Sequence, residues 1–289
     1  MKIGWIAGAY CASMAESERE LLRLRELGYD CIDYQGFINT ETPLFSLSED
    51  AWEAYLKEYR QRTEACGLTI HQTHGPWRSP ILDADEAQRA ERFEKMAKSI
   101  RGTAILGARY MAIHNLMPYG KVDEDPAYVR ELNKEFFLRL SEVGKENGVV
   151  ICMENMPFGG QTLARPADLL AFVSELDTPW IRLCLDVGHC TRLGESAGDA
   201  VRLWGPQYLR ILHIHDNDGT RDRHWIPMDG ITDWDSFSAA LSEIRFDGVL
   251  SIETVLPKTE QSEESLRSEE LRLTQRARAI AEAVSVKKR

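Results

Sequence analysis

The sequence predicts an α/β fold, a single (β/α)8 barrel over residues 1–289 whose active site lies at the carboxyl ends of the strands. Short apolar segments alternate with amphipathic segments, and the alternation repeats about every 40 residues, the length of one strand, one helix and two loops. Glycines mark this repeat at Gly28, Gly67, Gly107 and Gly148. Six apolar segments also end on His, Asp or Glu, as expected when parallel strands deliver polar side chains to one rim.

Eight apolar segments are expected to form the strands of the barrel. They cover residues 3–7, 30–34, 69–74, 109–114, 149–154, 181–186, 209–214 and 249–253. Some are apolar almost without interruption, which is typical of parallel strands that helices cover on their outer face. Eight is also the number of strands that closes this type of barrel.

Helices are expected between these strands. After an Asp125-Pro126 start signal, apolar residues recur at spacings of three and four up to the glycine at 148. Connections from helix to strand are only a few residues long, whereas the segments that leave the strands are long and rich in Pro, Gly and aromatic residues. Because binding and catalytic residues concentrate in such loops, we expect function on the long-loop face.

The composition excludes several classes of function. Lys and Arg number 35 against 46 Asp and Glu, and a net charge of -11 makes nucleic acid a disfavoured partner. The sequence contains no phosphate-binding glycine motif and no GxSxG motif.

Six scattered cysteines without a CxxC pair predict reduced thiols and a cytoplasmic protein. The first apolar segment is too short to span a membrane, and a homo-oligomer is left open.

The polar ends of four consecutive strands predict a metal centre. Glu154, Asp186, His213 and Glu253 end the fifth to eighth expected strands. Carboxylates are costly to bury without a partner, and one divalent metal ion shared between them is the simplest compensation. Their oxygen and nitrogen atoms suit Mn²⁺, Mg²⁺, Co²⁺ or Zn²⁺.

Each of these residues has a structural alternative when taken alone. His74 and His114, which end the third and fourth strands, would more often be hydrogen-bonded rim residues, and Glu154 or Asp186 could cap the helix that follows. The metal interpretation therefore depends on the whole set at successive strand ends. His213 and His215 are two residues apart and point to the same side, so either could reach the ion; we assign His213 to the ion and His215 to the substrate.

The rim loops carry further candidates for substrate binding. Arg221, Asp222 and His224 lie in the loop after the seventh strand, where a charge cluster is often simply solvated. Trp77 follows the third strand and could stack on a sugar ring or cover the top of the barrel. We assign these four residues, together with His74 and His114, to the substrate.

At these residues the chain resembles the sugar phosphate isomerase/epimerase family of the xylose isomerase-like TIM-barrel superfamily, which shares its fold with endonuclease IV. The matching segments are HGPW at 74, ENMP at 154, DVGH at 186, HIHDNDG at 213, DRH at 222 and IET at 252. The resemblance implies one divalent ion on Glu154, Asp186, His213 and Glu253, with the two glutamates also acting as acid and base. It further implies that His189 holds a substrate hydroxyl.

The resemblance leaves more than one reaction open. The first expectation is an isomerase or epimerase of a small sugar, sugar phosphate or polyol derivative, with glutamate-mediated proton transfer through a metal-stabilised enediolate. At two positions this chain differs from the ketose 3-epimerases of the superfamily. It has Gly160 where those enzymes have a glutamate, and Gly219 where they have an arginine; Arg221 is the nearest arginine that could substitute. A keto-polyol dehydratase would use the same proton abstraction.

A phosphodiesterase of the endonuclease IV type, with additional zinc ions, is a further alternative. The residues that match its nine zinc ligands are all present: His74, His114, Glu154, Asp186, His189, His213, Asp222, His224 and Glu253. Its DNA substrate conflicts with the acidic net charge. A non-catalytic carbohydrate-binding or metal-binding barrel would be expected to show gaps in this set, and there are none.

Overall fold

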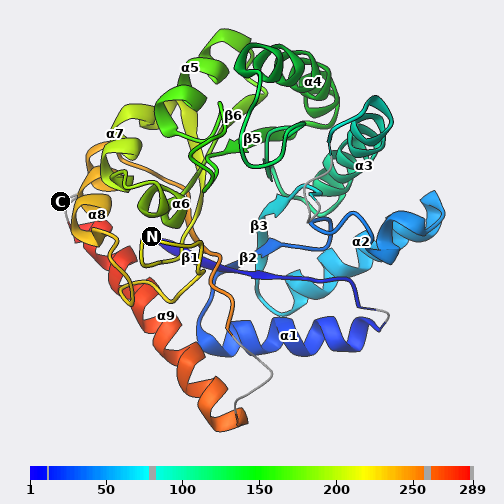
Figure 1. Cartoon of the computed structure of the whole chain (residues 1–289). Helices are drawn as coiled ribbons and strands as arrows, with labels where there is room; N and C mark the ends of the chain where they lie inside the picture. Colours follow the sequence, from blue (N-terminus) through cyan, green and yellow to red (C-terminus); the bar gives the residue numbers. More distant parts are fainter. Residues whose placement is uncertain (12, 78–82, 257–261, 287–289) are drawn as a thin grey trace.

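The computed structural model describes residues 1–11, 13–77, 83–256 and 262–286, and within them eight parallel strands form a nearly closed barrel surrounded by helices (Figure 1). The strands are β1 (Lys2–Ala7), β2 (Cys31–Tyr34), β3 (Thr69–His74), β4 (Tyr110–Ile113), β5 (Val150–Glu154), β6 (Ile181–Asp186), β7 (Leu209–His213) and β8 (Val249–Ile252). The predicted (β/α)8 fold is confirmed, and each predicted strand end lies within one residue of the observed one.

Helices follow the strands around the outside of the barrel. They are α1 (Met14–Leu27), α2 (Glu49–Ala65), α3 (Glu86–Ile105), α4 (Pro126–Asn147), α5 (Pro166–Leu176), α6 (Val187–Arg192), α7 (Ala197–Tyr208), α8 (Trp234–Glu243) and α9 (Glu263–Val286), with a 3-10 turn η1 (Pro43–Ser46) before α2. As predicted, α4 begins after Asp125, whose side chain accepts a hydrogen bond from the backbone N–H of Tyr128. It ends at Gly148 in the left-handed region, with φ 68°.

The strands are neighbours in the order β7-β6-β5-β4-β3-β2-β1-β8. β1 pairs with both β2 and β8, which joins the first and last strands. β7 and β8 meet through a single bridge, in which Ile214 N–H donates to Ser251 O at 2.8 Å and Glu253 N–H donates to Ile214 O at 3.0 Å. This seam closes the barrel beside the residues that end β7 and β8.

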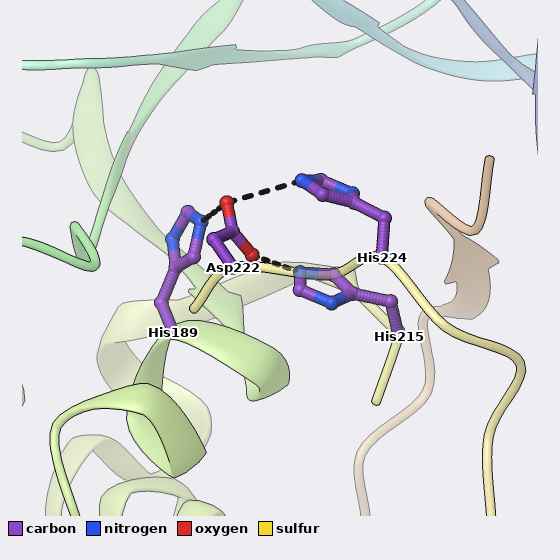
Figure 2. A group of neighbouring side chains, drawn as sticks. All are labelled: His189, His215, Asp222 and His224. Atoms are coloured by element: carbon purple, nitrogen blue, oxygen red, sulfur yellow. Dashed lines mark hydrogen bonds and ion pairs between the residues drawn. The ribbon is translucent and has the colours of Figure 1, made fainter. Parts of the chain in front are cut away.

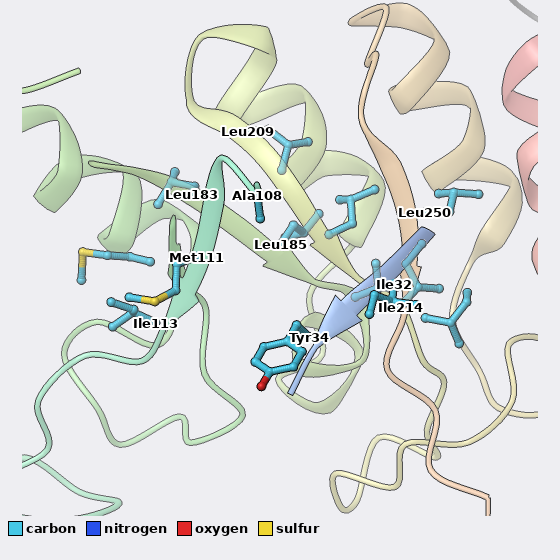
Figure 3. Packing of buried hydrophobic residues seen from close by; sticks show 14 of the residues in the cluster. Ile32, Tyr34, Ala108, Met111, Ile113, Leu183, Leu185, Leu209, Ile214 and Leu250 are labelled. Carbon is cyan, nitrogen blue, oxygen red and sulfur yellow. The ribbon is translucent and has the colours of Figure 1, made fainter. Parts of the chain in front are cut away.

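Apolar side chains pack on both faces of the barrel wall. The larger cluster fills the space between strands and helices and includes Ile32, Leu185 and Ile214 (Figure 3). A separate small cluster contains Cys152 and Cys184. Because successive residues of a strand point to opposite faces, the residues two positions after these cysteines share their inner face, nearer the mouth. Those residues are Glu154 and Asp186.

The structure also shows the state of the cysteines and the character of the helices. All six cysteines are free thiols. Among the helices in the described part of the chain, none combines the length and apolarity that crossing a membrane requires.

Candidate metal centre

Four strand ends bring one group of ionisable side chains together at the mouth of the barrel. Ligand atoms of Glu154, Asp186, His213 and Glu253 all lie within 4.8 Å of one another; we call these residues the deep cluster. All four are buried. The pairing of the parallel strands places their side chains at the same level along the barrel axis, since Asp186 on β6 is paired directly with His213 on β7. The structure therefore brings together the four residues that the sequence assigns to a metal ion.

Glu154 is surrounded by three histidines from other strands. Its Oε1 lies 2.8 Å from Nδ1 of His213, and its Oε2 lies 3.2 Å from Nε2 of His114 and 3.5 Å from Nε2 of His74. Burial alone would raise the pKa of this carboxyl group. The histidines outweigh burial and hold the pKa of Glu154 well below its usual range.

Glu253 is shifted in the opposite direction. Burial raises the pKa of its carboxyl group, and the nearby His213 and His224 offset that effect only in part. Nδ1 of His213 lies 3.6 Å from Oε2 of Glu253. The two glutamates of the deep cluster thus share one histidine neighbour, but their pKa values are shifted in opposite directions.

A second group lies above the deep cluster and consists of His189, His215, Asp222 and His224 (Figure 2); we call it the rim cluster. Asp222 lies at its centre. Its Oδ2 is 3.3 Å from Nε2 of His189 and 3.2 Å from Nε2 of His224, and its Oδ1 is 3.6 Å from Nε2 of His215. Burial would lower the pKa of His189 and of His224, but neighbouring carboxylates including Asp222 raise each to about 10.

Helix α6 and two neighbouring strands position His189. The helix begins because Asp186 caps it, accepting a hydrogen bond from His189 N–H at 2.6 Å. The ring is held by Nδ1, which donates to the carbonyl of Asn155 at 2.6 Å. The Asn155 side chain also pairs with the backbone of Asp186 in both directions. The capped start of α6 thus aims His189 at the cavity.

His215 joins the two clusters. Its Nε2 lies 3.0 Å from Oδ2 of Asp186 in the deep cluster, and its ring stacks on His224 with centroids 4.1 Å apart. The ring also packs against Gly188, where an added Cβ would lie 2.0 Å from Cε1 of His215. Glycine is required at position 188 by this close approach.

The chemistry of this mouth fits a divalent cation. Within the described part of the chain, Oε2 of Glu154 and Nδ1 of His114 and of His215 are buried without a well-formed hydrogen bond. Buried polar atoms of this kind are costly unless a further partner satisfies them. Three carboxylates of the deep cluster also need compensating charge. Six of the seven histidines of the chain lie here, and carboxylate oxygen with imidazole nitrogen is the donor set of Mn²⁺, Co²⁺ and Zn²⁺ sites.

A cavity of about 210 Å³ opens above the clusters, smaller than the 300–1,000 Å³ typical of sites for drug-sized ligands. Of the residues assigned to the substrate from the sequence, His74, Trp77, His114, His189, Asp222 and His224 line it. His215 lies beneath them and is fully buried. Arg221 is exposed on the loop and lies outside the lining.

The sequence prediction missed three residues that organise the site. Asp33 on β2 contacts His213, and the rule used for the other strands, that a carboxylate within an apolar strand needs a reason, would have found it. Asn155 couples β5 to β6 as described above. Asp216 accepts hydrogen bonds from Met228, Thr232 and Trp234 and so fixes the loop that carries Asp222 and His224; no local pattern marks that role.

Comparisons with known proteins agree with this architecture. Residues 21–276 match the family model described as xylose isomerase-like TIM barrel. The uncharacterized protein MJ1311 of Methanocaldococcus jannaschii is 30% identical over 213 residues, 69% of this chain and 68% of that protein. D-psicose 3-epimerase of Agrobacterium fabrum is 24% identical over 238 residues, 80% of this chain and 76% of the enzyme. The structure of a D-tagatose 3-epimerase-like protein superimposes with a TM-score of 0.76 at 22% identity over 99% of both chains, a likeness of fold alone.

Proposed function

Because the chain belongs to the xylose isomerase-like TIM barrel family, we propose that it is a divalent-metal-dependent isomerase or epimerase of a small sugar, sugar phosphate or polyol derivative. The observation that carries the proposal is the deep cluster, where two buried glutamates have pKa values shifted in opposite directions. Two carboxyl groups with separated pKa values are the usual arrangement of an acid and a base in one site.

Glu154, Asp186, His213 and Glu253 would hold the ion. A divalent ion bound there supplies Lewis acidity, which polarises a substrate carbonyl and offsets the negative charge of an enediolate. His215 is the alternative nitrogen donor, because its Nδ1 is buried without a partner and its ring contacts Asp186. A single ion is the minimum that this chemistry requires.

The two glutamates divide the proton transfer. Glu154 is the base, since its low pKa keeps the carboxylate ionised and able to take the proton next to the carbonyl. Glu253, whose pKa is raised, is the acid that returns a proton. Return to the opposite face of the same carbon gives epimerisation, and return to the neighbouring carbon gives isomerisation.

The cavity lining supports a small polyhydroxylated substrate. His189 and Asp222 face the cavity with groups that can bind hydroxyls, and the ring of Trp77, 5.2 Å from that of His114, offers an aromatic face for a sugar ring. The relatives named as 3-epimerases of ketoses point to the same class. Arg221 would contact the substrate only if its loop moved toward the cavity.

Two other reactions remain as alternatives. A keto-polyol dehydratase needs the same base and ion, so the deep cluster supports it equally. A phosphodiesterase with additional zinc ions draws support from the rim cluster, where His189, Asp222 and His224 converge, and from His74 and His114 beside Glu154. The net charge of -11 weighs against a DNA substrate.

The proposal can be tested without knowing the substrate. The protein is stripped with a chelator, restored with single divalent ions and screened in D₂O against sugars, keto-sugars and inositols for deuterium incorporation. We expect metal-dependent exchange, at about one ion per chain, and a loss of about 10³-fold in Glu154→Gln, which lacks the base. The exposed Glu142→Gln is the matched control and should keep full exchange. Exchange that survives in Glu154→Gln would remove Glu154 from its role as the base, and three ions per chain would favour the phosphodiesterase.

A further inference from the structure

Asp33 is a buried carboxylate beneath the deep cluster to which the proposed reaction assigns no role. It lies on β2, is fully buried and has no Lys or Arg partner among the described residues. Its Oδ1 accepts a hydrogen bond from Gln35 at 3.1 Å. Its other neighbours come from three other strands: Gln72 on β3 donates at 2.8 Å, Ser251 on β8 at 3.2 Å, and Nε2 of His213 on β7 lies 3.1 Å away. These three residues from the strands all approach the same oxygen, Oδ2.

His213 links this carboxylate to the proposed metal site. The ring has Nε2 on Asp33 at 3.1 Å and Nδ1 on Glu154 at 2.8 Å. Asp33, His213 and Glu154 therefore form one continuous buried chain that leads from β2 to the mouth of the barrel. The chain crosses β2, β7 and β5, which are not neighbours in the sheet.

This geometry accounts for a carboxylate at a costly position. A buried carboxylate is costly to remove from water, and an apolar side chain of similar volume would fill the same space. What an apolar side chain cannot do is accept the Nε2–H of His213. With that proton held by Asp33, the ring cannot rotate about its Cβ–Cγ bond, and Nδ1 stays directed at the carboxylates of the mouth.

We propose that Asp33 is a positioning residue, which fixes the ring of His213 and through it the Glu154 carboxylate for divalent-ion binding. The inference rests on the proposed function only in taking the deep cluster as the ion site. Partners that orient the ligands of a metal ion in this way typically contribute about 10–100-fold to its affinity.

The test compares divalent-ion affinity, measured by competition with a chromophoric chelator, in the wild type and in Asp33→Ala. We expect a loss of about 10–100-fold. Asp33→Asn keeps the volume and one acceptor oxygen, so its ion affinity should lie between those of the wild type and Asp33→Ala. This variant decides the question if Asp33→Ala does not fold. The control is Ser251→Ala, which removes another contact from the same oxygen without touching His213; its affinity should stay within about threefold of wild type.

Two further measurements separate positioning from a general loss of stability. If Asp33 acts through His213, Asp33→Ala should lower the affinity of a His213→Gln protein by no more than about twofold, because the two effects are not independent. In the metal-free wild type, ¹⁵N-resolved NMR should show a slowly exchanging ring N–H of His213, and this signal should be lost in Asp33→Ala. Wild-type affinity in both Asp33 variants, full additivity in the double variant, or an unchanged His213 signal would each overturn the proposal.

These outcomes are distinct from a failure of the proposed function. A wild-type protein that binds no divalent ion would defeat the metal-dependent reaction, while the NMR signal of His213 would still report whether Asp33 holds the ring. A protein that binds the ion with unchanged affinity in Asp33→Ala would defeat this inference alone.

Discussion

The deep cluster and the rim cluster use the same residue types but are built from different parts of the fold. All four deep residues lie at the ends of strands, where backbone ladders fix their position, and their side chains are at most 12% exposed. In the rim cluster, His189 lies on a short helix and Asp222 and His224 lie in a loop, with side chains 28% and 27% exposed. His224 even adopts a positive φ of 50°, an uncommon backbone conformation that the surrounding contacts must stabilise.

The difference indicates a division of labour. Strand ends give a site whose geometry exists before any ligand binds, which suits an ion and the proton transfer beside it. Loop residues held by one another can adjust to a substrate, and loops are where specificity usually resides. We therefore expect changes in the deep cluster to remove ion binding and changes in the rim cluster to alter substrate use.

The most direct way to break this comparison is a matched pair of Asp-to-Asn changes. Asp186→Asn should weaken divalent-ion binding by at least about 100-fold, because it removes an anionic ligand rather than an outer partner. Asp222→Asn should weaken it by less than about tenfold. Competition with a chelator measures both. Equal losses, or a metal content that falls in Asp222→Asn, would mean that the rim cluster holds an ion of its own.

The two histidines of the β7 end sharpen the boundary between the clusters. His213→Gln should lower ion affinity by at least about tenfold, since it removes both a ligand and the partner of Asp33. His215→Gln should keep the affinity within about threefold and reduce substrate turnover instead. Isothermal titration with Mn²⁺ and the deuterium exchange assay report the two quantities. The reverse result would make His215 the ligand and His213 a residue that orients Glu154.

A smaller effect is expected where the clusters touch, at Gly188. In Gly188→Ala the new methyl group would collide with the His215 ring, and relieving such overpacking typically costs about 1–3 kcal/mol. The matched control is Gly159→Ala, where the nearest atom to a Cβ is at an ordinary 3.4 Å and the change in unfolding free energy should be within about 0.5 kcal/mol. Urea denaturation of the chelated proteins compares them. Equal stability of both variants would show that His215 moves aside freely.

His71 serves as a contrast to both clusters, because it is the one histidine of the chain outside the mouth. Burial lowers its pKa to about 4, whereas in the unfolded chain it titrates near 6.5. Between these values the unfolded state binds the proton more readily, so stability is lost as the pH falls from about 6.5 to 4. Between pH 7 and 4.5, the free energy of unfolding of His71→Gln should therefore fall by about 2 kcal/mol less than that of the wild type. Urea denaturation with chelator present measures it. Parallel pH curves would contradict this.

The contrast between the clusters also explains what could be predicted from the sequence. Apolar segments of strand length gave every strand to within one residue, because a buried parallel strand leaves a local pattern. The deep residues were found by the same reasoning, since an ionisable side chain at the end of an apolar segment is visible in the sequence.

The rim cluster could not be derived in this way. The loop between β7 and α8 brings Asp222 onto His189 through contacts with Asp216 that no periodicity reveals. The sequence marked Asp222 and His224 only as part of a charge cluster in a loop, which did not predict their contacts. Asp33 was missed for a different reason, because its importance comes from a contact with His213, which is 180 residues away in the chain. The sequence nevertheless showed that Asp33 is a carboxylate within an apolar strand segment.

The seam between β7 and β8 has a consequence for biosynthesis. Glu154 leaves the ribosome about 100 residues before Glu253, and Asp186 about 70 residues before it. A nascent chain therefore carries these carboxylates before the proposed ion site can be completed. Chains of this size generally fold through intermediates as synthesis proceeds. Ion binding and the pairing of β8 that closes the barrel are then both expected late in translation. A ribosome-stalled chain that ends before β8 should remain sensitive to protease even when Mn²⁺ is supplied.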